Sequence, residues 1–386
     1  MIAEAVVLAA GEGRRLRPLT KYQPKPMLPV ANRPVVEYVV DALVAAGVER
    51  IVCVVGHRAD RIQTHLTKRY PDLDLAFVRQ ERRLGSGHAL LAAAAHVGER
   101  FLVVNGDNVV DADTVRATIA RGVETDAVAT VAVAHSETPE AYGVVVVDHG
   151  RIADIDEHPT ESDTYLVNAG VYVFDRSVFA ALDRTPRWGD ELRLTDALDH
   201  LDGPVTSVLV GEGWLDPSNP WQLLTVTEAL LARDGTNSVH ASARIHPTAV
   251  VEGHVVVGPD CELGPGAVVR GGTCLQENVH VGPNAVVERS VLLTDARVGA
   301  GAVVRDSVVG PGVQLGDGVV SPGGLVDVRL GGTLHANRRL GSVVADRAVI
   351  GPNVTLEPGS QVDADATVRA GSIVTDPARD PAEVTA

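Results

Sequence analysis

The sequence is poor in aromatic residues, although it is rich in apolar ones. Phe, Trp and Tyr make up 3% of its 386 residues, whereas apolar residues make up 45%. Its cores are therefore expected to consist of Val, Leu, Ala and Ile, and branched side chains of this kind favour strands. A chain of this length exceeds one ordinary core, so we expect two domains.

Cysteines are few, and no apolar run is long. Cys53, Cys261 and Cys274 are widely spaced without a CxxC pair, so buried small side chains are favoured over disulfides or a metal site. No stretch approaches the ~20 apolar residues that cross a bilayer. The first residues lack a basic segment and reach a glycine early, unlike a signal peptide. We expect a cytoplasmic protein that does not enter a membrane.

Positive charge is scarce, and lysine is scarcer still. The formal net charge of −16 argues against nucleic acid and anionic membranes as partners, because both require a basic face. Of the 34 basic residues only Lys21, Lys25 and Lys68 are lysines. Such a composition is typical of proteins from a salt-rich cytoplasm and of GC-rich coding alike, and both explanations stay open. An anionic substrate would have to be met by a local cluster of cations.

In the first half of the chain, strand-like and helix-like segments alternate. Short Val-rich runs at 5–9, 51–55 and 101–104 alternate with helical patterns at 34–46, 59–68 and 87–97. This order predicts a mostly parallel sheet that is covered on both faces. Ligands of such sheets bind at the carboxyl ends of the strands, where a glycine turn and Asp107 both fall.

The second half has a period of six residues. Aliphatic side chains recur at Ile245, Val251, Val257, Leu263, Val269, Leu275, Val281, Val287 and Leu293, and again from Val344 to Val374. With Gly-Pro turns between them, these positions predict a parallel β-helix. The alternative, a β-sandwich, does not keep one period over nine consecutive positions.

These patterns predict the domain boundaries. A first domain covers 1–233 and closes with a helix at 221–233, and a linker covers 234–240. The β-helix then covers 241–376, with a loop pushed out of the coil near 321–340, and a tail covers 377–386.

Residues 8–29 concentrate cations beside a glycine turn. Gly11 and Gly13 are accompanied by five basic residues: Arg14, Arg15, Arg17, Lys21 and Lys25. The third glycine of a dinucleotide fingerprint is replaced by Leu16, and the Gly-Lys-Ser/Thr of a P-loop is missing. Glycine lets backbone N–H groups approach a phosphate closely. The segment therefore predicts polyphosphate binding in preference to a solvated basic loop, because two of the three lysines lie here.

This segment resembles the G-x-G-T-R-L…K-P motif of the sugar nucleotidylyltransferases. In family order, Gln80 with residues 84–89 (LGSGHA) resembles the segment that recognises the base. Residues 104–107 (VNGD) resemble the strand end that holds magnesium, and Trp214-Leu215-Asp216 resembles the stretch with the second metal carboxylate. Residues 141–143, 156–157 and 168–170 resemble sugar-binding loops. The resemblance covers essentially the whole chain, because the hexapeptide half also follows this catalytic domain in several members.

The resemblance implies a Rossmann-like nucleotidyltransferase domain followed by a left-handed β-helix that commonly trimerises. It implies nucleotidylyl transfer from UTP or dTTP to glucose 1-phosphate or N-acetylglucosamine 1-phosphate, with Mg²⁺ as cofactor and pyrophosphate as by-product. It assigns catalysis to Arg15 and Lys25, and Mg²⁺ to Asp107 and Asp216. Nucleotide contacts fall on Leu8, Ala10, Gly11, Gly13, Gln80, Gly85 and Ser86. Sugar contacts fall on Gly143, Glu157 and Asn168.

The residue types suit this chemistry, but each has an alternative. Both substrates are anions, so positioning and charge neutralisation suffice and no protein nucleophile is needed. Taken alone, Asp107 could be a turn residue, Asp216 a helix cap, and Gln80 part of a solvated face. His158 stands where many relatives carry a phosphate-contacting lysine, which puts the efficiency of turnover in question.

Two other functions compete with the leading one. Bifunctional relatives also acetylate an amino-sugar phosphate in the β-helix, using a histidine that the shortened region 320–340 lacks at the matching place. A general base must reach its proton, so we expect acetyl transfer to be absent. A non-catalytic regulatory subunit is the third possibility. The joint retention of Arg15, Lys25, Asp107 and Asp216 argues against it.

Overall fold

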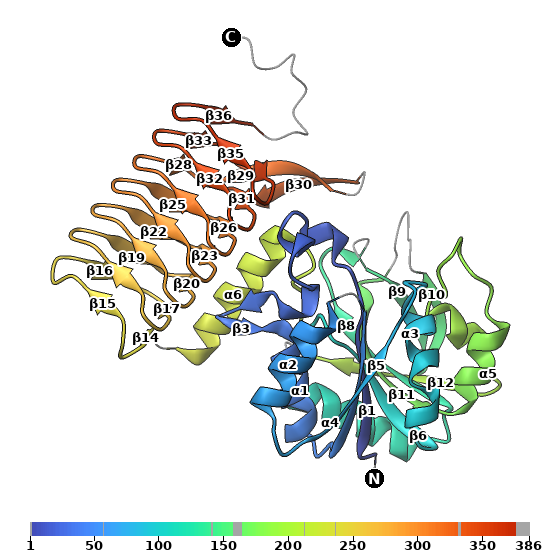
Figure 1. Ribbon diagram of the computed structural model, residues 1–386. Coiled ribbons are helices and arrows are strands. Elements are labelled where there is room, and N and C mark those ends of the chain that lie inside the picture. The colour runs from blue at the N-terminus through green and yellow to red at the C-terminus, as the bar shows by residue number, and fades with distance from the viewer. Residues whose placement is uncertain are drawn as a thin grey trace. The chain divides into compact units, whose positions relative to one another are not determined.

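The computed structural model describes residues 2–56, 58–139, 142–156, 164–211, 213–235, 237–330 and 333–375 (Figure 1). The chain forms two compact units. The first comprises 1–12, 24–27 and 34–216, and the second comprises 13–23, 28–33 and 217–386. Two short N-terminal segments therefore group with the C-terminal half of the chain. The predicted tail at 377–386 lies outside the described residues.

The first unit is built on a sheet with nine described strands, in the order β5-β4-β1-β6-β11-β8-β12-β10-β9. Their bounds in that order are Asp74–Arg79, Arg50–Val55, Glu4–Ala9, Arg100–Asn105, Leu166–Asp175, Ala129–His135, Val205–Val210, Arg151–Asp156 and Val144–Asp148. Strands β5, β4, β1 and β6 pair in parallel, as predicted. Beyond β6 only β8 and β12 pair in parallel, and the remaining pairings are antiparallel.

The sheet is therefore mixed rather than mostly parallel. One reason is the connection between β9 and β10, where His149 and Gly150 have φ values of 47° and 76°. Two successive residues with positive φ suit a tight hairpin turn, which joins antiparallel strands.

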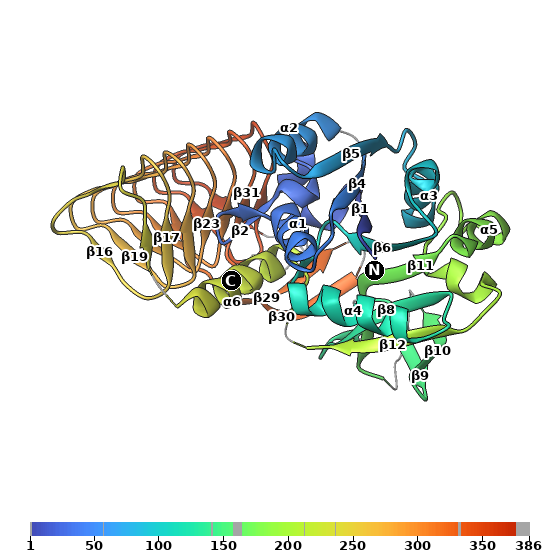
Figure 2. The same cartoon turned by 90° about the horizontal axis from the view of Figure 1, so that it is seen from below.

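Helices cover both faces of this sheet (Figure 2). One face packs against α1 (Val35–Ala45), α2 (Ala59–Arg69) and α4 (Ala112–Glu124), and the other against α3 (Ser86–Ala92) and α5 (Ser177–Arg184). Side chains of β1 alternate between the two cores, with Val7 in one and Val6 and Leu8 in the other. The helix predicted at 87–97 ends at Ala92 and is followed by a 3₁₀ turn, Ala94–His96.

The second unit is a parallel β-helix of three sheets, each with seven described strands. The first sheet holds β14 (Ser238–Val239), β17 (Val255–Val257), β20 (Thr273–Leu275), β23 (Val291–Leu292), β26 (Val308–Val309), β31 (Val343–Val344) and β34 (Gln361–Val362). The second holds β15 (Arg244–Ile245), β18 (Glu262–Leu263), β21 (His280–Val281), β24 (Arg297–Val298), β27 (Gln314–Leu315), β32 (Val349–Ile350) and β35 (Thr367–Val368). The third holds β16 (Val250–Val251), β19 (Val268–Arg270), β22 (Val286–Glu288), β25 (Val303–Arg305), β28 (Val320–Ser321), β33 (Thr355–Leu356) and β36 (Ile373–Val374). Three hexapeptides per coil and three parallel sheets are consistent with the left-handed β-helix that the resemblance implies.

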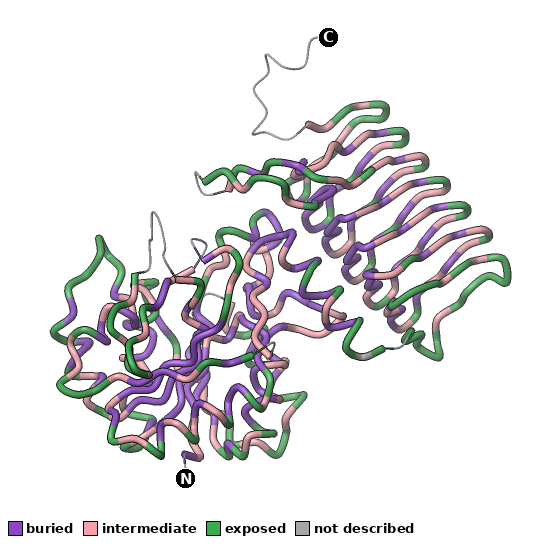
Figure 3. Tube along the Cα trace, turned by 180° about the vertical axis from the view of Figure 1, so that it is seen from behind, coloured by how far each residue is buried: buried purple, intermediate pink, exposed green. Residues whose placement is uncertain are grey.

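The aliphatic positions stack as the period of six predicts, except at one corner. Ile245 pairs with Leu263, and Leu263 pairs with Val281. Leu275, however, pairs with Leu292, so the predicted ninth position, Leu293, is wrong by one residue. The corners before β23 and before β26 are each one residue shorter than the regular spacing, and at the first of them the two candidate positions, 292 and 293, are both leucine. In Figure 3 the coils are coloured by how far each residue is buried.

The boundaries of the β-helix differ from a simple repeat. Helix α6 (Pro220–Asp234) groups with the second unit, and pairing of the coil begins with Ser238 inside the segment predicted as a linker. The segment predicted as a loop near 321–340 is an antiparallel hairpin of β29 (Leu325–Leu330) and β30 (Thr333–Arg339). The three cysteines are buried and free, as predicted. No helix among the described residues is long and apolar enough to span a bilayer.

Buried hydroxyl groups close the base of this hairpin. The Ser321 side chain lies 2.9 Å from the Ser307 hydroxyl and 3.0 Å from that of Ser342. Between the hairpin and Ser342 lies Gly341, where a Cβ would overlap the Arg305 carbonyl oxygen and the Ser307 hydroxyl. Only a residue without a side chain therefore fits at the point where the chain returns from the hairpin to the coil.

Gly341→Ala should lower the free energy of unfolding by about 2 kcal/mol or more, because overpacking a closed site costs roughly 1–3 kcal/mol. Urea unfolding followed by circular dichroism measures the change. Gly271→Ala is the matched control, because a Cβ there meets the neighbouring coil only at ordinary distances of 3.6–3.7 Å. Equal stability of the two variants would contradict the packing argument.

Candidate active site

The ends of β1 and β6 place the glycine turn and Asp107 at one edge of the sheet. The two strands are parallel, with Leu8 in register with Asn105. The Gly106 N–H donates to the Leu8 carbonyl at 2.9 Å, and a Cβ on Gly106 would come within 3.1 Å of that oxygen. The space around Gly11 is open, so its backbone can be approached closely. The predicted meeting of these two turns is confirmed.

A two-residue ladder brings Asp216 to the same edge. Strand β13 (Trp214–Leu215) pairs antiparallel with β7 (Val109–Val110), and Leu215 lies opposite Val109. The antiparallel register places Asp216 opposite Asn108, the residue after Asp107. Gly213 extends the pairing by accepting the Asp111 N–H at 3.0 Å, and a Cβ on Gly213 would overlap the Asp111 carboxylate.

Lys25 joins the two carboxylates. Its Nζ lies 2.7 Å from Oδ2 of Asp107 and 3.8 Å from Oδ1 of Asp216. The side chains of Lys25 and Asp216 are 10% and 6% exposed, whereas that of Asp107 is 31% exposed. Lys25 begins a 3₁₀ turn, Lys25–Met27, in which the Met27 N–H bonds the Pro24 carbonyl at 2.9 Å. A buried charge is tolerated only when it is paired, and here Lys25 pairs with both carboxylates.

Asn108 supports this arrangement and was missed by the sequence analysis. It is buried, and with its amide oriented to satisfy both neighbours it donates to Oδ1 of Asp216 at 3.2 Å. In the same orientation it accepts the indole N–H of Trp214 at 3.2 Å. The available signal was its position directly after the strand-end aspartate, between a turn and two buried valines.

The two carboxylates suit a hard divalent cation. Their oxygens already converge on a positive charge, the Lys25 ammonium. Among the described residues no group of three or more His, Cys, Asp or Glu side chains could hold a metal. Mg²⁺ commonly uses one or two carboxylates and completes its sphere with water and substrate phosphates. The donor set therefore fits Mg²⁺ bound together with a polyphosphate.

The segment predicted to read the base is clamped by a second loop. Gly85 has a φ of +93°, and a Cβ there would overlap the Leu192 carbonyl. The Gly87 N–H donates to that carbonyl at 2.9 Å, and the Ser86 hydroxyl accepts the Leu194 N–H at 3.0 Å. Leu192 and Leu194 act through their backbones, so sequence analysis had no side-chain signal for them.

Gln80 is a buried support of this segment, so the alternative of a solvated face is wrong. Its amide nitrogen lies 3.0 Å from the Gly85 carbonyl and 3.1 Å from Nδ1 of His88. Burial, followed by the charges of Arg187 and Arg82, lowers the pKa of His88. A neutral imidazole can accept the Gln80 N–H. The predicted contact of Gln80 with a base stays a prediction.

Two of the predicted sugar-binding residues are adjacent. The Asn168 N–H donates to the Gly143 carbonyl at 2.9 Å, so the two loops meet at the edge of β9 and β11. The Asn168 side chain donates to the Tyr172 hydroxyl at 2.6 Å and accepts the Gly170 N–H at 3.0 Å, which fixes an irregularity in β11. Glu157 and His158 lie outside the described residues.

The aromatic ring of Tyr142 connects the loop before Gly143 to strand β13. It contacts Trp214 edge-on, with 5.4 Å between the ring centroids. Trp214 immediately precedes Leu215 and Asp216, so a packed aromatic pair links Gly143 to the site.

Gly13 and Arg15 belong to the second unit. Gly13 has a φ of 64° and opens the 3₁₀ turn Arg14–Leu16. Its carbonyl accepts the Leu16 N–H at 3.0 Å and the Thr20 hydroxyl at 2.9 Å. Leu16 is buried while Arg15 is exposed, so the turn keeps its cations on the surface. In the first unit, Leu8 and Ala10 are buried, and their backbones flank the end of β1.

Comparison with known proteins identifies the family. A family model described as Nucleotidyl transferase matches residues 4–233. The chain belongs to the nucleotidyl transferase family. A second model, GMPPB C-terminal domain, matches residues 234–326.

Relatives of this nucleotidyl transferase are found among archaeal proteins. It is 32% identical over 258 residues to the bifunctional protein GlmU of Methanocaldococcus jannaschii, a match that covers 66% of this chain and 60% of GlmU. It is 35% identical over 217 residues to UTP–glucose-1-phosphate uridylyltransferase AglF of Haloferax volcanii, covering 55% of this chain and 89% of AglF. A UDP-glucose pyrophosphorylase solved with UDP-glucose shares the fold, with a TM-score of 0.55, 24% identity, and coverage of 60% of this chain and 100% of that one.

Lys25→Met in the nucleotidyl transferase should lower the free energy of unfolding at pH 7 by about 2–4 kcal/mol, because breaking a buried pair leaves a carboxylate uncompensated. Adding Asp216→Asn should recover part of the loss. Urea unfolding of both variants measures these changes. The matched control is Lys68→Met, which removes an exposed lysine of α2. A loss no larger than that of the control would show that the three charges are not coupled.

Proposed function

We propose that this protein transfers a nucleotidyl group from UTP or dTTP to glucose 1-phosphate or N-acetylglucosamine 1-phosphate, giving a nucleotide sugar and pyrophosphate. The observation that carries the proposal is the meeting of Lys25, Asp107 and Asp216 beside the open turn at Gly11. Cations and carboxylates at the carboxyl ends of parallel strands suit a polyphosphate substrate. Membership of the nucleotidyl transferase family supports it.

The reaction joins two anions. An oxygen of the sugar phosphate bonds to the α-phosphorus of the triphosphate, and the bond from that phosphorus to the pyrophosphate breaks. The electron pair leaves with pyrophosphate, and no general base is needed because the sugar phosphate is already ionised. Lys25 and Arg15 neutralise the triphosphate and the negative charge that develops on it, while Gly11 and Gly13 give backbone contacts. Catalysis of this type consists of positioning and electrostatic stabilisation.

Asp107 and Asp216 would hold Mg²⁺, with Asn108 orienting Asp216. Bound there, the ion would neutralise phosphate oxygens and align the reactants. Lys25 and a divalent cation would then share the negative charge of two carboxylates and a triphosphate.

The base and the sugar are proposed from the relatives. The names of AglF and of the structurally similar pyrophosphorylase specify uridine nucleotides and glucose. Thymine differs from uracil by one methyl group, which an apolar pocket discriminates by only ~1–3 kcal/mol. We therefore keep dTTP in the proposal, with Gln80, Gly85 and Ser86 at the base and Gly143, Glu157 and Asn168 at the sugar.

Acetyl transfer is not part of the proposal. The hairpin of β29 and β30 carries His335, and its ring packs against Trp221 of α6 with 5.0 Å between centroids. We assign His335 a structural role in the hairpin, because its ring packs against Trp221. The match to GlmU covers only 60% of that protein, so its printed description as bifunctional does not carry over as a whole.

We also propose a cytoplasmic homo-oligomer, a trimer through the β-helix. An open trough of about 1100 Å³ runs along the second sheet of the coil, from Ala243 to Pro352. Along this sheet Glu262 pairs with Arg244 and lies 3.2 Å from His280. The trimer is proposed from the resemblance, and sedimentation analysis tests it.

Pyrophosphate release tests the main proposal. We expect release that requires Mg²⁺ and both substrates, when UTP and dTTP are tried against each sugar phosphate at low and at molar salt. Asp107→Asn should abolish it, with a loss of about 100-fold or more. The control Asp113→Asn alters a carboxylate that is 85% exposed on α4, and should keep full activity. If folded protein releases no pyrophosphate with any pair of substrates, the proposal is refuted and a regulatory subunit is favoured.

Asn108→Ala should raise the Mg²⁺ concentration for half-maximal activity by about tenfold, because groups that orient metal ligands typically contribute 10–100-fold. Titration of Mg²⁺ at saturating substrates measures the shift. An unchanged Mg²⁺ dependence would show that Asp216 needs no such support.

A further inference from the structure

Lys25 lies on a short stretch between two segments that belong with the β-helix. Residues 13–23 and 28–33 group with the second unit, whereas 24–27 group with the first. Tyr22 precedes Lys25 by three residues, so the two Cα atoms are at most ~11 Å apart. Lys25 therefore follows directly on a segment that groups with the second unit.

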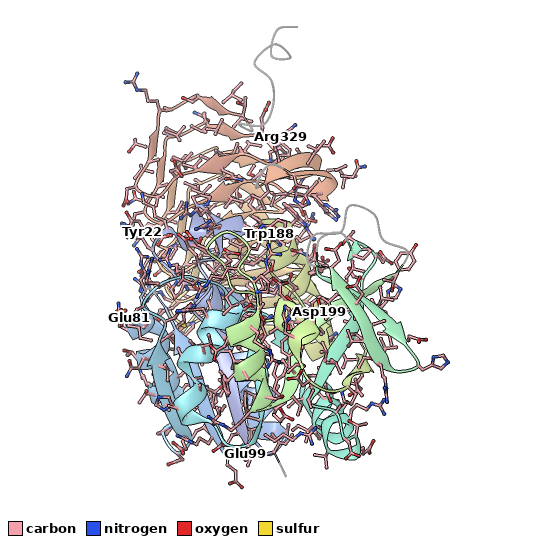
Figure 4. All side chains as sticks on the ribbon, turned by 90° about the vertical axis from the view of Figure 1, so that its right-hand side faces the viewer. Tyr22, Glu81, Glu99, Trp188, Asp199 and Arg329 are labelled. Carbon is pink, nitrogen blue, oxygen red and sulfur yellow. The ribbon has the colours of Figure 1, made fainter. Side chains whose placement is uncertain are left out.

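Tyr22, labelled in Figure 4, contacts two corners of successive coils. Its hydroxyl donates to Oδ2 of Asp365 at 2.8 Å. The other oxygen of that carboxylate accepts Nε and Nη2 of Arg347, each at 2.8 Å. The Arg347 guanidinium also stacks 4.6 Å from the centroid of the Tyr22 ring. One carboxylate thus joins an arginine of the preceding coil to the end of the arginine-rich segment.

Further contacts hold the neighbouring residues. Nζ of Lys21 lies 3.5 Å from the Ala364 carbonyl. After Lys25, the Asn32 side chain donates to the Leu275 carbonyl of β20 at 2.6 Å. The chain is therefore attached to the β-helix on both sides of Lys25.

We expect these contacts to affect the position of segment 13–23 more than the free energy of folding. The side chains of Arg347 and Asp365 are 56% and 46% exposed, and ion pairs at such exposure contribute little to folding. The Tyr22 hydroxyl, and then Arg347, lower the pKa of Asp365, so its carboxylate stays ionised as an acceptor. Within residues 13–23 Leu16, Pro18 and Leu19 are buried, whereas Tyr22 lies at the surface end of the segment and is held by the polar contacts above.

We propose that Tyr22, Asp365 and Arg347 are positioning residues for nucleotidyl transfer. They hold segment 13–23, which carries Arg15, on the β-helix. The inference rests on the proposed function. It gives the β-helix a part in catalysis, because a misplacement of about 1 Å in a catalytic group can cost about 100-fold in rate.

A double-mutant cycle tests the contact. Tyr22→Phe and Asp365→Asn should each lower kcat/KM for the nucleotide by about five- to tenfold, and the double variant should lose no more than either one. KM for the sugar phosphate should stay within about twofold. The control Asp295→Asn changes an aspartate at an equivalent corner, with a φ of 64° against 66°, which accepts from Asn278 instead. It should keep wild-type kinetics.

Hydrogen exchange of residues 13–23 supplies a readout independent of turnover. We expect faster exchange in Asp365→Asn than in wild type or Asp295→Asn, at an unchanged midpoint of unfolding. Wild-type kinetics in both single variants, additive losses in the double variant, or unchanged exchange would each overturn the inference. An inactive wild type would refute the proposed function alone, and exchange would still decide whether the β-helix holds the segment.

Discussion

The site of this protein depends on the pairing of one ammonium group with two carboxylates. Lys25, Asp107 and Asp216 come from distant parts of the chain, and Lys25 and Asp216 are nearly buried. Buried charges of one sign cannot be kept without partners, so the elements that deliver them must agree in position. The register of β1 with β6, the ladder of β7 with β13 and the turn at 24–27 each deliver one member.

The two units solve the problem of core formation in different ways. The α/β unit joins strands that are far apart in sequence, and it needs helices on both faces because each strand is apolar on both sides. The β-helix pairs each coil with the next, so its stability is close to a sum over neighbours. A surface that repeats every coil offers many similar corners, and Tyr22 contacts those at Arg347 and Asp365. The regular unit can therefore hold the irregular segment 13–23 at a defined place.

Sequence predicted those features that repeat or that follow a strand end. The period of six placed the coils, and it erred at Leu293 because Leu292 and Leu293 suit the stack equally well. Strands β7 and β13 are two residues long, so no periodicity could show that Asp216 meets Asp107. The resemblance supplied both residues, but their geometry required the structure. Leu192 was missed because a backbone carbonyl leaves no pattern in the sequence, and Asn108 because its only signal was its place directly after Asp107.

Lysine suits position 25 because its positive charge is confined to a compact ammonium group. In the second unit arginines pair with carboxylates, as Arg289 does with Glu228 of α6 and with Asp306 of the next coil. A planar guanidinium suits such paired contacts, because its donors form a rigid fork. Between Asp107 and Asp216 the cation must leave room for the polyphosphate of the proposed reaction. A compact ammonium with three donors meets that demand, which explains why a chain so poor in lysine keeps one here.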